Sequence, residues 1–320
     1  MKRRKFIHDS AIIGASSIVP GILTHFSGMY SNSRYRKVHK VLTAGETHVG
    51  TLPILRAFAG NHLDYVSPFV LFDEFGPVNI SPQSDPLKVE AHPHAGVIPT
   101  TYFVKGSGHH KDSLNYDFQV HEGEFMMFSS GKGAIHMEES GDALKKNGGS
   151  LHGFQIWLNM PSKYKWQDPS TMVYNASKIP KIIKKDYTAE VVMGELFGYK
   201  SAIETLSPAF YYRIQLKENT RIDIPTDPRH NAMVYVVDGE LEIAEQKRLK
   251  QHQIALYERG SSDINLFARK GAECFVLGGQ PLNEVVYSYG PFVMNTREEI
   301  ERCYANYRAG KMGDPRIVNQ

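Results

Sequence analysis

A strand-and-turn unit that occurs twice constrains the fold of this 320-residue chain more than any other feature of its sequence. Residues 102–106, Tyr-Phe-Val-Lys-Gly, are matched by residues 235–239, Tyr-Val-Val-Asp-Gly. The apolar run at 125–128 is matched by a second run at 254–257, and a glycine lies three residues after each. Repetition at a near-constant offset is typical of two copies of one structural unit. Because the 27 glycines and 17 prolines favour short strands joined by turns, the sequence predicts two all-β domains.

Two pairs of metal-ligand residues lie in the first copy. His92 and His94 are two residues apart, and so are His136 and Glu138. Side chains alternate between the two faces of a strand, so each pair can point into one interior. Three imidazoles and a carboxylate suit a divalent transition metal. We expect one ion per chain, with Fe(II) as the first candidate, and manganese, nickel, cobalt and copper fit the same ligands. The alternative is that each inward histidine is a hydrogen-bonded core residue.

The second copy lacks these ligands. The repeat offsets place Pro225 and Asp227 at the positions of the first pair, and Asn265 and Phe267 at those of the second. A lone His230 does not restore a cluster. The sequence therefore predicts a second domain without metal.

Other polar residues have simpler interpretations. Asp73 and Glu74 follow a buried run, where a solvated strand end is favoured over a role beside the metal site. Residues 109–113 are predicted to form a polar bend. His152 is interpreted as a hydrogen-bonded residue at a strand start, and Cys274, within an apolar run, as a buried structural thiol.

Charge and cysteine content exclude several classes of function. The net charge of +3 comes from the first 30 residues, where four basic residues at positions 2–5 outweigh Asp9. The remaining body is neutral and offers no electrostatic footprint for nucleic acid. Two cysteines in the whole chain, Cys274 and Cys303, are too few for a disulfide scaffold.

The first 30 residues form a segment of the twin-arginine export type. Arg3 and Arg4 precede a modest apolar run at 11–23 that is too short to span a bilayer comfortably. The interpretation predicts export of the folded protein to the periplasm without a stable membrane span. The alternative is a basic tail on a cytoplasmic protein, and cleavage of the segment is left open.

The expected domain boundaries follow from these patterns. A metal-binding domain is predicted at 38–165, a domain without metal at 186–290 and a helical tail at 291–320, with a connection rich in lysine and proline at about 162–186. Asn295 or Thr296 can cap a helix that ends at Arg308, because two glutamates follow in its first turn.

Several strings together resemble the pirin family of the cupin superfamily. They are HPHAG, FDEFGP, GKGAIHMEES, HGFQIWLN and YGPFVMNTREEI, and the resemblance extends from about Val38 to Gly313. It implies a bicupin, with two stacked antiparallel β-barrels and a metal only in the first. The implied ligands are His92, His94, His136 and Glu138.

The resemblance also implies a function, although this chain departs from the family pattern directly after the second histidine. Family members typically carry Arg and then Gly-Phe-Glu-Thr after the second histidine, whereas this chain has Ala95, Gly96, Val97, Ile98 and Pro99. We therefore expect a smaller and more apolar rim beside the metal. The implied activity is dioxygenation of a flavonol such as quercetin, or a related phenol, by O₂.

Glu138 is in this interpretation both a ligand and a catalytic proton shuttle, and the protein is expected to be a monomer. The alternatives are a redox- or metal-sensing module that binds another protein, and a bicupin whose metal only stiffens the barrel.

Overall fold

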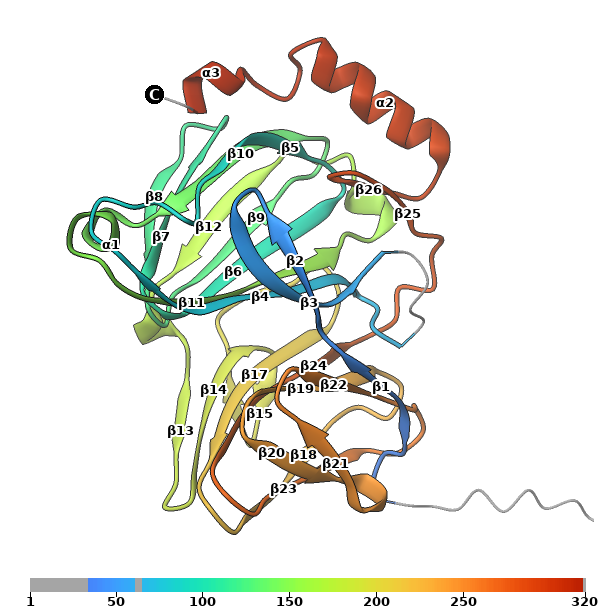
Figure 1. The fold of residues 1–320 in the computed structure, drawn as a ribbon. Coiled ribbons are helices and arrows are strands. Elements are labelled where there is room, and N and C mark those ends of the chain that lie inside the picture. The colour runs from blue at the N-terminus through green and yellow to red at the C-terminus, as the bar shows by residue number, and fades with distance from the viewer. Residues whose placement is uncertain (1–33, 61–64, 319–320) are drawn as a thin grey trace, which may run out of the picture. The chain divides into compact units, whose positions relative to one another are not determined.

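The first barrel is built from two antiparallel sheets, shown from blue to yellow-green in Figure 1. The computed structural model describes residues 34–60 and 65–318. The larger sheet has the order β12 (Ser170–Tyr174), β9 (Phe125–Ser129), β6 (Val97–Lys105), β11 (Gly149–Asn159), β4 (Phe69–Ile80), β3 (Leu52–Ala59) and β2 (Gly45–Val49). The smaller has the order β5 (Val89–His94), β10 (Ala134–Ser140), β7 (Ser107–Asp112) and β8 (Asp117–His121).

The second barrel repeats this arrangement. Its larger sheet has the order β1 (Val38–Thr43), β22 (Gln253–Tyr257), β19 (Asn231–Asp238), β24 (Ala272–Gly279), β17 (Ala209–Leu216), β14 (Tyr187–Met193) and β13 (Lys181–Ile183). The smaller has the order β18 (Thr220–Pro225), β23 (Asp263–Ala268), β20 (Glu240–Ile243) and β21 (Lys247–Lys250). The repeated sequence units lie on β6 and β19 and on β9 and β22, which hold the same positions in their sheets. The predicted all-β bicupin is confirmed.

The second barrel takes one edge strand from the start of the chain, where the predicted boundaries had placed the first barrel. β1 follows the N-terminal segment yet pairs with β22, with Val41 opposite Ala255, and appears in Figure 1 as a blue strand among orange ones. β12 lies in the predicted connection yet pairs with β9 of the first barrel. The side chain of Arg36 explains the position of β1, because it is 1% exposed and donates to carbonyl oxygens of the second barrel. A short alternating strand does not encode which sheet edge it joins.

The interface between the barrels is an aromatic core around a buried carboxylate. Phe72 lies 4.6 Å from Tyr235 between ring centroids, so the larger sheets of the two barrels pack directly on each other. Glu74 is fully buried and accepts from the Tyr235 hydroxyl at 2.5 Å, from His152 at 2.7 Å and from His252 at 3.0 Å. The predicted hydrogen-bonded role of His152 is confirmed. The predicted solvation of Asp73 and Glu74 is wrong, because β4 is covered on both faces.

The C-terminal segment returns to the first barrel. A hairpin of β25 (Tyr287–Tyr289) and β26 (Phe292–Met294) leads to helix α2 (Arg297–Arg308) and the short α3 (Pro315–Val318). Thr296, one of the two predicted caps, is the N-cap of α2 and forms a capping box with Glu299. Ile300 and Cys303 of α2 pack against the outer face of the sheet that contains β10. Cys274 is buried and unpaired, also as predicted.

Besides three short 3₁₀ helices at Ser162–Tyr164, Ala176–Lys178 and Ala244–Gln246, three small elements remain in the described chain. They are α1 (Asp142–Asn147) and the hairpin of β15 (Glu195–Leu196) and β16 (Tyr199–Lys200). Within the described ranges, no helix has the length and apolar character needed to cross a membrane. The twin-arginine segment at 1–30 lies outside these ranges, so its role stays a prediction.

Candidate metal centre

Three adjacent strands of the smaller sheet bring the predicted ligands together. In the register of β5, β10 and β7, His136 lies opposite His92 on one side and Asp112 on the other. Glu138 lies opposite His110 in the next inward position. Alternation along β10 turns Ile135 and Met137 to the outer face, where α2 covers them. The strand period that the sequence indicated therefore selects which side chains enter the barrel.

The imidazoles of His92, His94 and His136 converge on one point. One ligand atom from each of the three lies within 4.8 Å of the other two. Nε2 of His92 and Nε2 of His136 are 3.0 Å apart. Two nitrogen ligands at right angles around one ion, each about 2.1 Å from it, lie about 3.0 Å apart. The spacing of the nitrogens thus fits a shared metal ion.

Backbone carbonyls assign the protons of two of these rings. Nδ1 of His92 lies 2.8 Å from the carbonyl oxygen of Glu90, and Nδ1 of His94 lies 3.2 Å from that of Pro291. A carbonyl oxygen only accepts, so in the neutral ring the proton belongs on Nδ1. Nε2 of each ring is left with a lone pair directed into the site.

A buried chain of hydrogen bonds makes the same assignment for His136. Oδ1 of Asp112 accepts from the backbone N–H groups of Leu114 at 2.9 Å and Tyr116 at 3.2 Å, and Oδ2 accepts from Nε2 of His110 at 3.1 Å. His110 in its neutral form then presents a lone pair at Nδ1, which lies 3.4 Å from Nδ1 of His136. The proton of His136 therefore belongs on Nδ1, and its Nε2 is a third free lone pair.

The protonation equilibria favour this arrangement. Burial, followed by the neighbouring His92, holds the pKa of His94 well below its ordinary value of 6.5. Burial and then His92, His94 and His110 have the same effect on the pKa of His136. Both rings are neutral at neutral pH. Three lone pairs that face one another, two of them on buried rings, repel unless an electron-pair acceptor lies between them, so the donor set fits a divalent transition metal.

Glu138 lies beside the three imidazoles, but its hydrogen bonds are to residues of the larger sheet. One of its oxygens accepts from the Thr101 hydroxyl at 3.2 Å and the other from the Gln155 amide at 2.9 Å. Its ligand atom is within 4.8 Å of those of His110 and His136, a second grouping that omits His92 and His94. The structure therefore joins three of the four predicted ligands at one point. The direct ligation by Glu138 stays a prediction.

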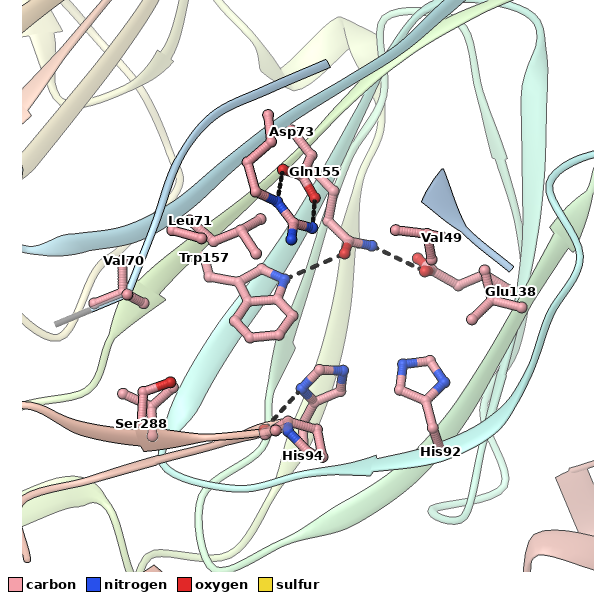
Figure 2. A pocket seen from close by; sticks show the side chains of 17 residues that line it. Val49, Val70, Leu71, Asp73, His92, His94, Glu138, Gln155, Trp157 and Ser288 are labelled. Atoms are coloured by element: carbon pink, nitrogen blue, oxygen red, sulfur yellow. Dashed lines mark hydrogen bonds and ion pairs between the residues drawn. The ribbon is translucent and has the colours of Figure 1, made fainter. Parts of the chain in front are cut away.

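A cavity of about 400 Å³ opens onto His92, His94 and Glu138 (Figure 2). Its walls include Trp157, whose ring centroid is 4.8 Å from that of His94, and the apolar side chains of Val70 and Leu71. Trp157 donates to Gln155 at 3.2 Å, so one chain of contacts links the aromatic wall to Glu138. Another wall holds the ion pair of Arg56 and Asp73, and the β25–β26 hairpin forms the side next to His94. The volume and lining suit a small aromatic ligand.

The expected effect of the unusual residues after His94 is wrong. Ala95, Val97 and Ile98 are at most 2% exposed, and none of them is among the described residues that line the cavity. Ala95 and Val97 pack against the β25–β26 hairpin, and Ile98 faces the interface between the barrels. These residues turn inward because β6 begins immediately after the ligand strand. The walls of the cavity come instead from β3, β4, β11 and the C-terminal hairpin.

The second barrel has aliphatic side chains where the first has imidazoles. On β23 the buried inward residues are Ile264 and Leu266, which alternate with the predicted equivalents Asn265 and Phe267. Asn265 instead donates to Asp223 at 2.5 Å on the outer side. The repeat offset that predicted these equivalents is therefore wrong by one residue. An error of one residue moves a side chain to the opposite face of its strand. That the second barrel binds no metal stays a prediction.

Sequence reasoning missed the residues behind the ligands. His110 and Asp112 lie on β7 rather than in a polar bend, and both are nearly fully buried. Their period-two spacing, the same as that of His92 and His94, could have identified them. Gln155 and Trp157 have the same spacing on β11, but neither they nor Arg56 are of a metal-ligand type, so the sequence carries no signal for them.

Comparison with known proteins identifies the family. A family model described as Pirin matches residues 51–158, and one described as the pirin C-terminal cupin domain matches residues 211–313. A pirin-like protein of Solanum lycopersicum is 31% identical over 285 residues, which cover 88% of this chain and 94% of that protein. Pirin of Homo sapiens is 29% identical over 265 residues, 81% of this chain and 88% of its own length.

Solved structures agree with this relationship. The crystal structure of quercetin 2,3-dioxygenase from Acinetobacter baumannii superimposes with a TM-score of 0.85 at 29% identity, covering 88% of this chain and 99% of that one. A bacterial pirin from Escherichia coli in complex with nickel(II) shares the fold, with a TM-score of 0.58 at 18% identity over 76% of this chain and 99% of that one. From the two matched domains and the relatives aligned over most of its length, we conclude that this chain belongs to the pirin family.

Proposed function

We propose that this protein is a metal-dependent dioxygenase that acts on a flavonol or a related phenol. The observation that carries the proposal is the meeting of three imidazole lone pairs beside a largely apolar cavity of about 400 Å³, which His92 and His94 line. The relative of known structure named quercetin 2,3-dioxygenase supports the reaction class, and the nickel(II) complex of the Escherichia coli pirin supports a divalent ion. Fe(II) remains our first candidate for the ion.

The side chains around the cavity have separate tasks in this proposal. A bound divalent transition metal would supply Lewis-acid polarisation of the substrate oxygens and access to O₂ chemistry. His92, His94 and His136 would hold that ion, each fixed in the required tautomer by the group behind its Nδ1. Trp157 and Leu71 present apolar surface to the rings of the substrate. Enclosure of the rings excludes water from the reacting carbon atoms.

Glu138 is the residue that we assign to proton transfer. A phenol reacts with O₂ more readily once its hydroxyl proton has been removed, so the site needs a base next to the substrate oxygen. The Glu138 carboxylate lines the cavity, and one of its oxygens is held by Gln155. It can accept the substrate proton at that oxygen when the hydroxyl replaces the Gln155 amide as donor. The hydrogen bond from Thr101 keeps the other oxygen in place during the exchange.

Oxygen consumption by protein loaded with iron, manganese or nickel tests the proposal. With quercetin and with simple catechols as substrates, we expect activity in at least one metal form. His94→Ala should lose both the metal and the activity. Glu138→Gln should lose activity, whereas the control Glu122→Gln, in an exposed ion pair with Lys105, should retain it. If every loaded and folded form is inactive, the sensing module becomes the better account of the site.

A further inference from the structure

Lys165 is a lysine without exposed surface that lies behind the metal site. Its Nζ donates to the carbonyl oxygen of Gly96 at 2.8 Å, to Oδ1 of Asn159 at 2.6 Å and to the carbonyl oxygen of Val293 at 2.7 Å. An ammonium group has three N–H donors, and each is matched here by one oxygen. Such complete pairing fixes the position of all three oxygens around one atom.

The surroundings of this ammonium group are unusual because they contain no directly paired carboxylate. Among the described residues, none forms an ion pair with Lys165, whose partners are neutral oxygens. Burial lowers the pKa of Lys165 to about 7, although Glu284, Glu299 and Cys303 act in the opposite direction. An ammonium group buried without a counter-ion is costly, so its position calls for a role beyond packing.

Lys165 joins two segments that meet at the metal site. Gly96 follows His94 by two residues, and Val293 belongs to β26. The two segments are in close contact, because Val293 donates its N–H to the carbonyl oxygen of Ala95 at 3.0 Å. A Cβ atom on Gly96, where φ is +72°, would lie 2.1 Å from the carbonyl oxygen of Val293. Only glycine permits this approach.

The segment that Lys165 holds also determines the state of His94. Pro291, two residues before Val293, supplies the carbonyl oxygen that lies 3.2 Å from Nδ1 of His94. Pro291, Gly290 and Val293 line the cavity. Displacement of β26 from Gly96 would therefore have two effects. It would remove the Pro291 carbonyl that accepts from Nδ1 of His94, and it would open one side of the cavity.

We propose that Lys165 is a positioning residue for the metal site: it fastens the β25–β26 hairpin to the turn after His94, so that the Pro291 carbonyl keeps Nε2 of His94 free to bind metal. This inference rests on the proposed metal site but not on the proposed substrate. Lys165 touches neither the metal ligands nor the cavity. Its effect passes through the backbone of Gly96 and Val293.

The same C-terminal segment is also held by other contacts that lie further from the metal site. These contacts make it possible to distinguish the role of Lys165 next to the site from a general contribution to stability. Trp166 donates to Glu299 at 3.0 Å, and the hydroxyl of Ser162 donates to Glu284 at 3.0 Å. These contacts remain when Lys165 is replaced. A variant at Lys165 should therefore keep α2 in place and lose only the local attachment of β26.

Three measurements on Lys165→Met test the inference, with Lys163→Met as the matched control at the exposed lysine two positions earlier. In the metal-free protein, the amide of Val293 should exchange with solvent faster. The imidazole ¹⁵N spectrum of His94 should change from the Nδ1–H tautomer to a mixture. Affinity for Ni²⁺, measured by competition with a chelator, should fall about 10- to 100-fold. The control should match the wild type in all three.

A second variant acts on the same contact from the other side. Gly96→Ala places a methyl group against the carbonyl oxygen of Val293 and should reproduce the tautomer change and the loss of Ni²⁺ affinity, even if Lys165→Met does not fold. The inference is overturned if a folded variant with faster exchange at Val293 keeps the wild-type His94 tautomer and Ni²⁺ affinity. If the wild type binds no divalent metal, the proposed function fails instead, and the exchange and tautomer measurements still test the role of Lys165.

Discussion

The groups behind the imidazoles decide what this site can bind. Backbone carbonyls set the proton on His92 and His94, and Asp112 sets the proton on His136 through His110. Such partners behind a ligand commonly change metal affinity by 10- to 100-fold. The neutral rings of His94 and His136, held so by burial, then offer lone pairs without competition from protons at neutral pH.

Replacement of Asp112 by Asn should move the proton of His110, and then that of His136, to the other nitrogen of each ring. Two backbone N–H groups point at Oδ1 of Asp112, so the amide must keep its oxygen there and place its NH₂ at the former Oδ2. That NH₂ donates to Nε2 of His110, which moves the His110 proton to Nδ1 and the His136 proton to Nε2. A proton then occupies the position of the metal. We expect Asp112→Asn to bind Ni²⁺ about 10- to 100-fold more weakly.

The matched control for this variant is Asp117→Asn, since Asp117 is exposed and contacts His109 on the same sheet. It should leave Ni²⁺ affinity unchanged. Chelator competition measures both proteins, and the imidazole ¹⁵N spectrum of His136 reports the tautomer. An unchanged His136 tautomer in Asp112→Asn would show that the chain does not transmit the assignment.

The sequence predicted the imidazoles that meet at this site but not the residues that hold them in place. His92, His94 and His136 were predicted because strand alternation converts a spacing of two residues into a shared face. Lys165 was placed in a connection, since its three acceptors come from positions 96, 159 and 293 and leave no local pattern. Residues that act through the backbone of distant segments cannot be found from spacing.

Individual elements show the same division between local and distant information. Helix α2 was predicted correctly because its cap and first turn are local signals, with Thr296 and Glu299 forming a capping box. β1 was predicted in the first barrel and β12 in the connection between the domains, because the pattern of an edge strand does not show which sheet it joins. Their placement depends on distant partners such as those of Arg36.

The cap of α2 should contribute measurably to stability. Thr296→Ala removes the side-chain acceptor for the backbone N–H of Glu299, which lies 3.2 Å away. We expect the free energy of unfolding to fall by about 1 kcal/mol, measured by chemical denaturation. Thr296→Ser retains the hydroxyl and should remain within about 0.5 kcal/mol of the wild type. Equal losses in the two variants would mean that the methyl group, not the hydrogen bond, stabilises this end of the helix.

For the whole molecule, the union of two barrels creates an interior that neither has alone. The internal repeat predicted both barrels, because each copy carries its own strand pattern. It could not predict their contact, where Tyr102 of the first barrel donates to Glu190 of the second. Lys181 at 2.8 Å and Arg213 at 3.2 Å complete the surroundings of this carboxylate. Charged groups at the interface therefore couple stability to pH.

The pH dependence of unfolding should reveal this contact. Burial by itself raises the pKa of Glu190, but hydrogen bonds from Lys181 and Tyr102 and the charge of Arg213 outweigh it, so the pKa lies below 4.5. The unfolded chain then binds the proton more tightly, and the stabilisation is complete above pH 4.5 and is lost as the pH falls through the lowered pKa. Glu190→Gln should cost about 2 kcal/mol at neutral pH. The difference from wild type should shrink at acid pH, whereas the exposed Glu46→Gln should show no such difference. Parallel curves for wild type and Glu190→Gln across this range would refute a charged interface contact.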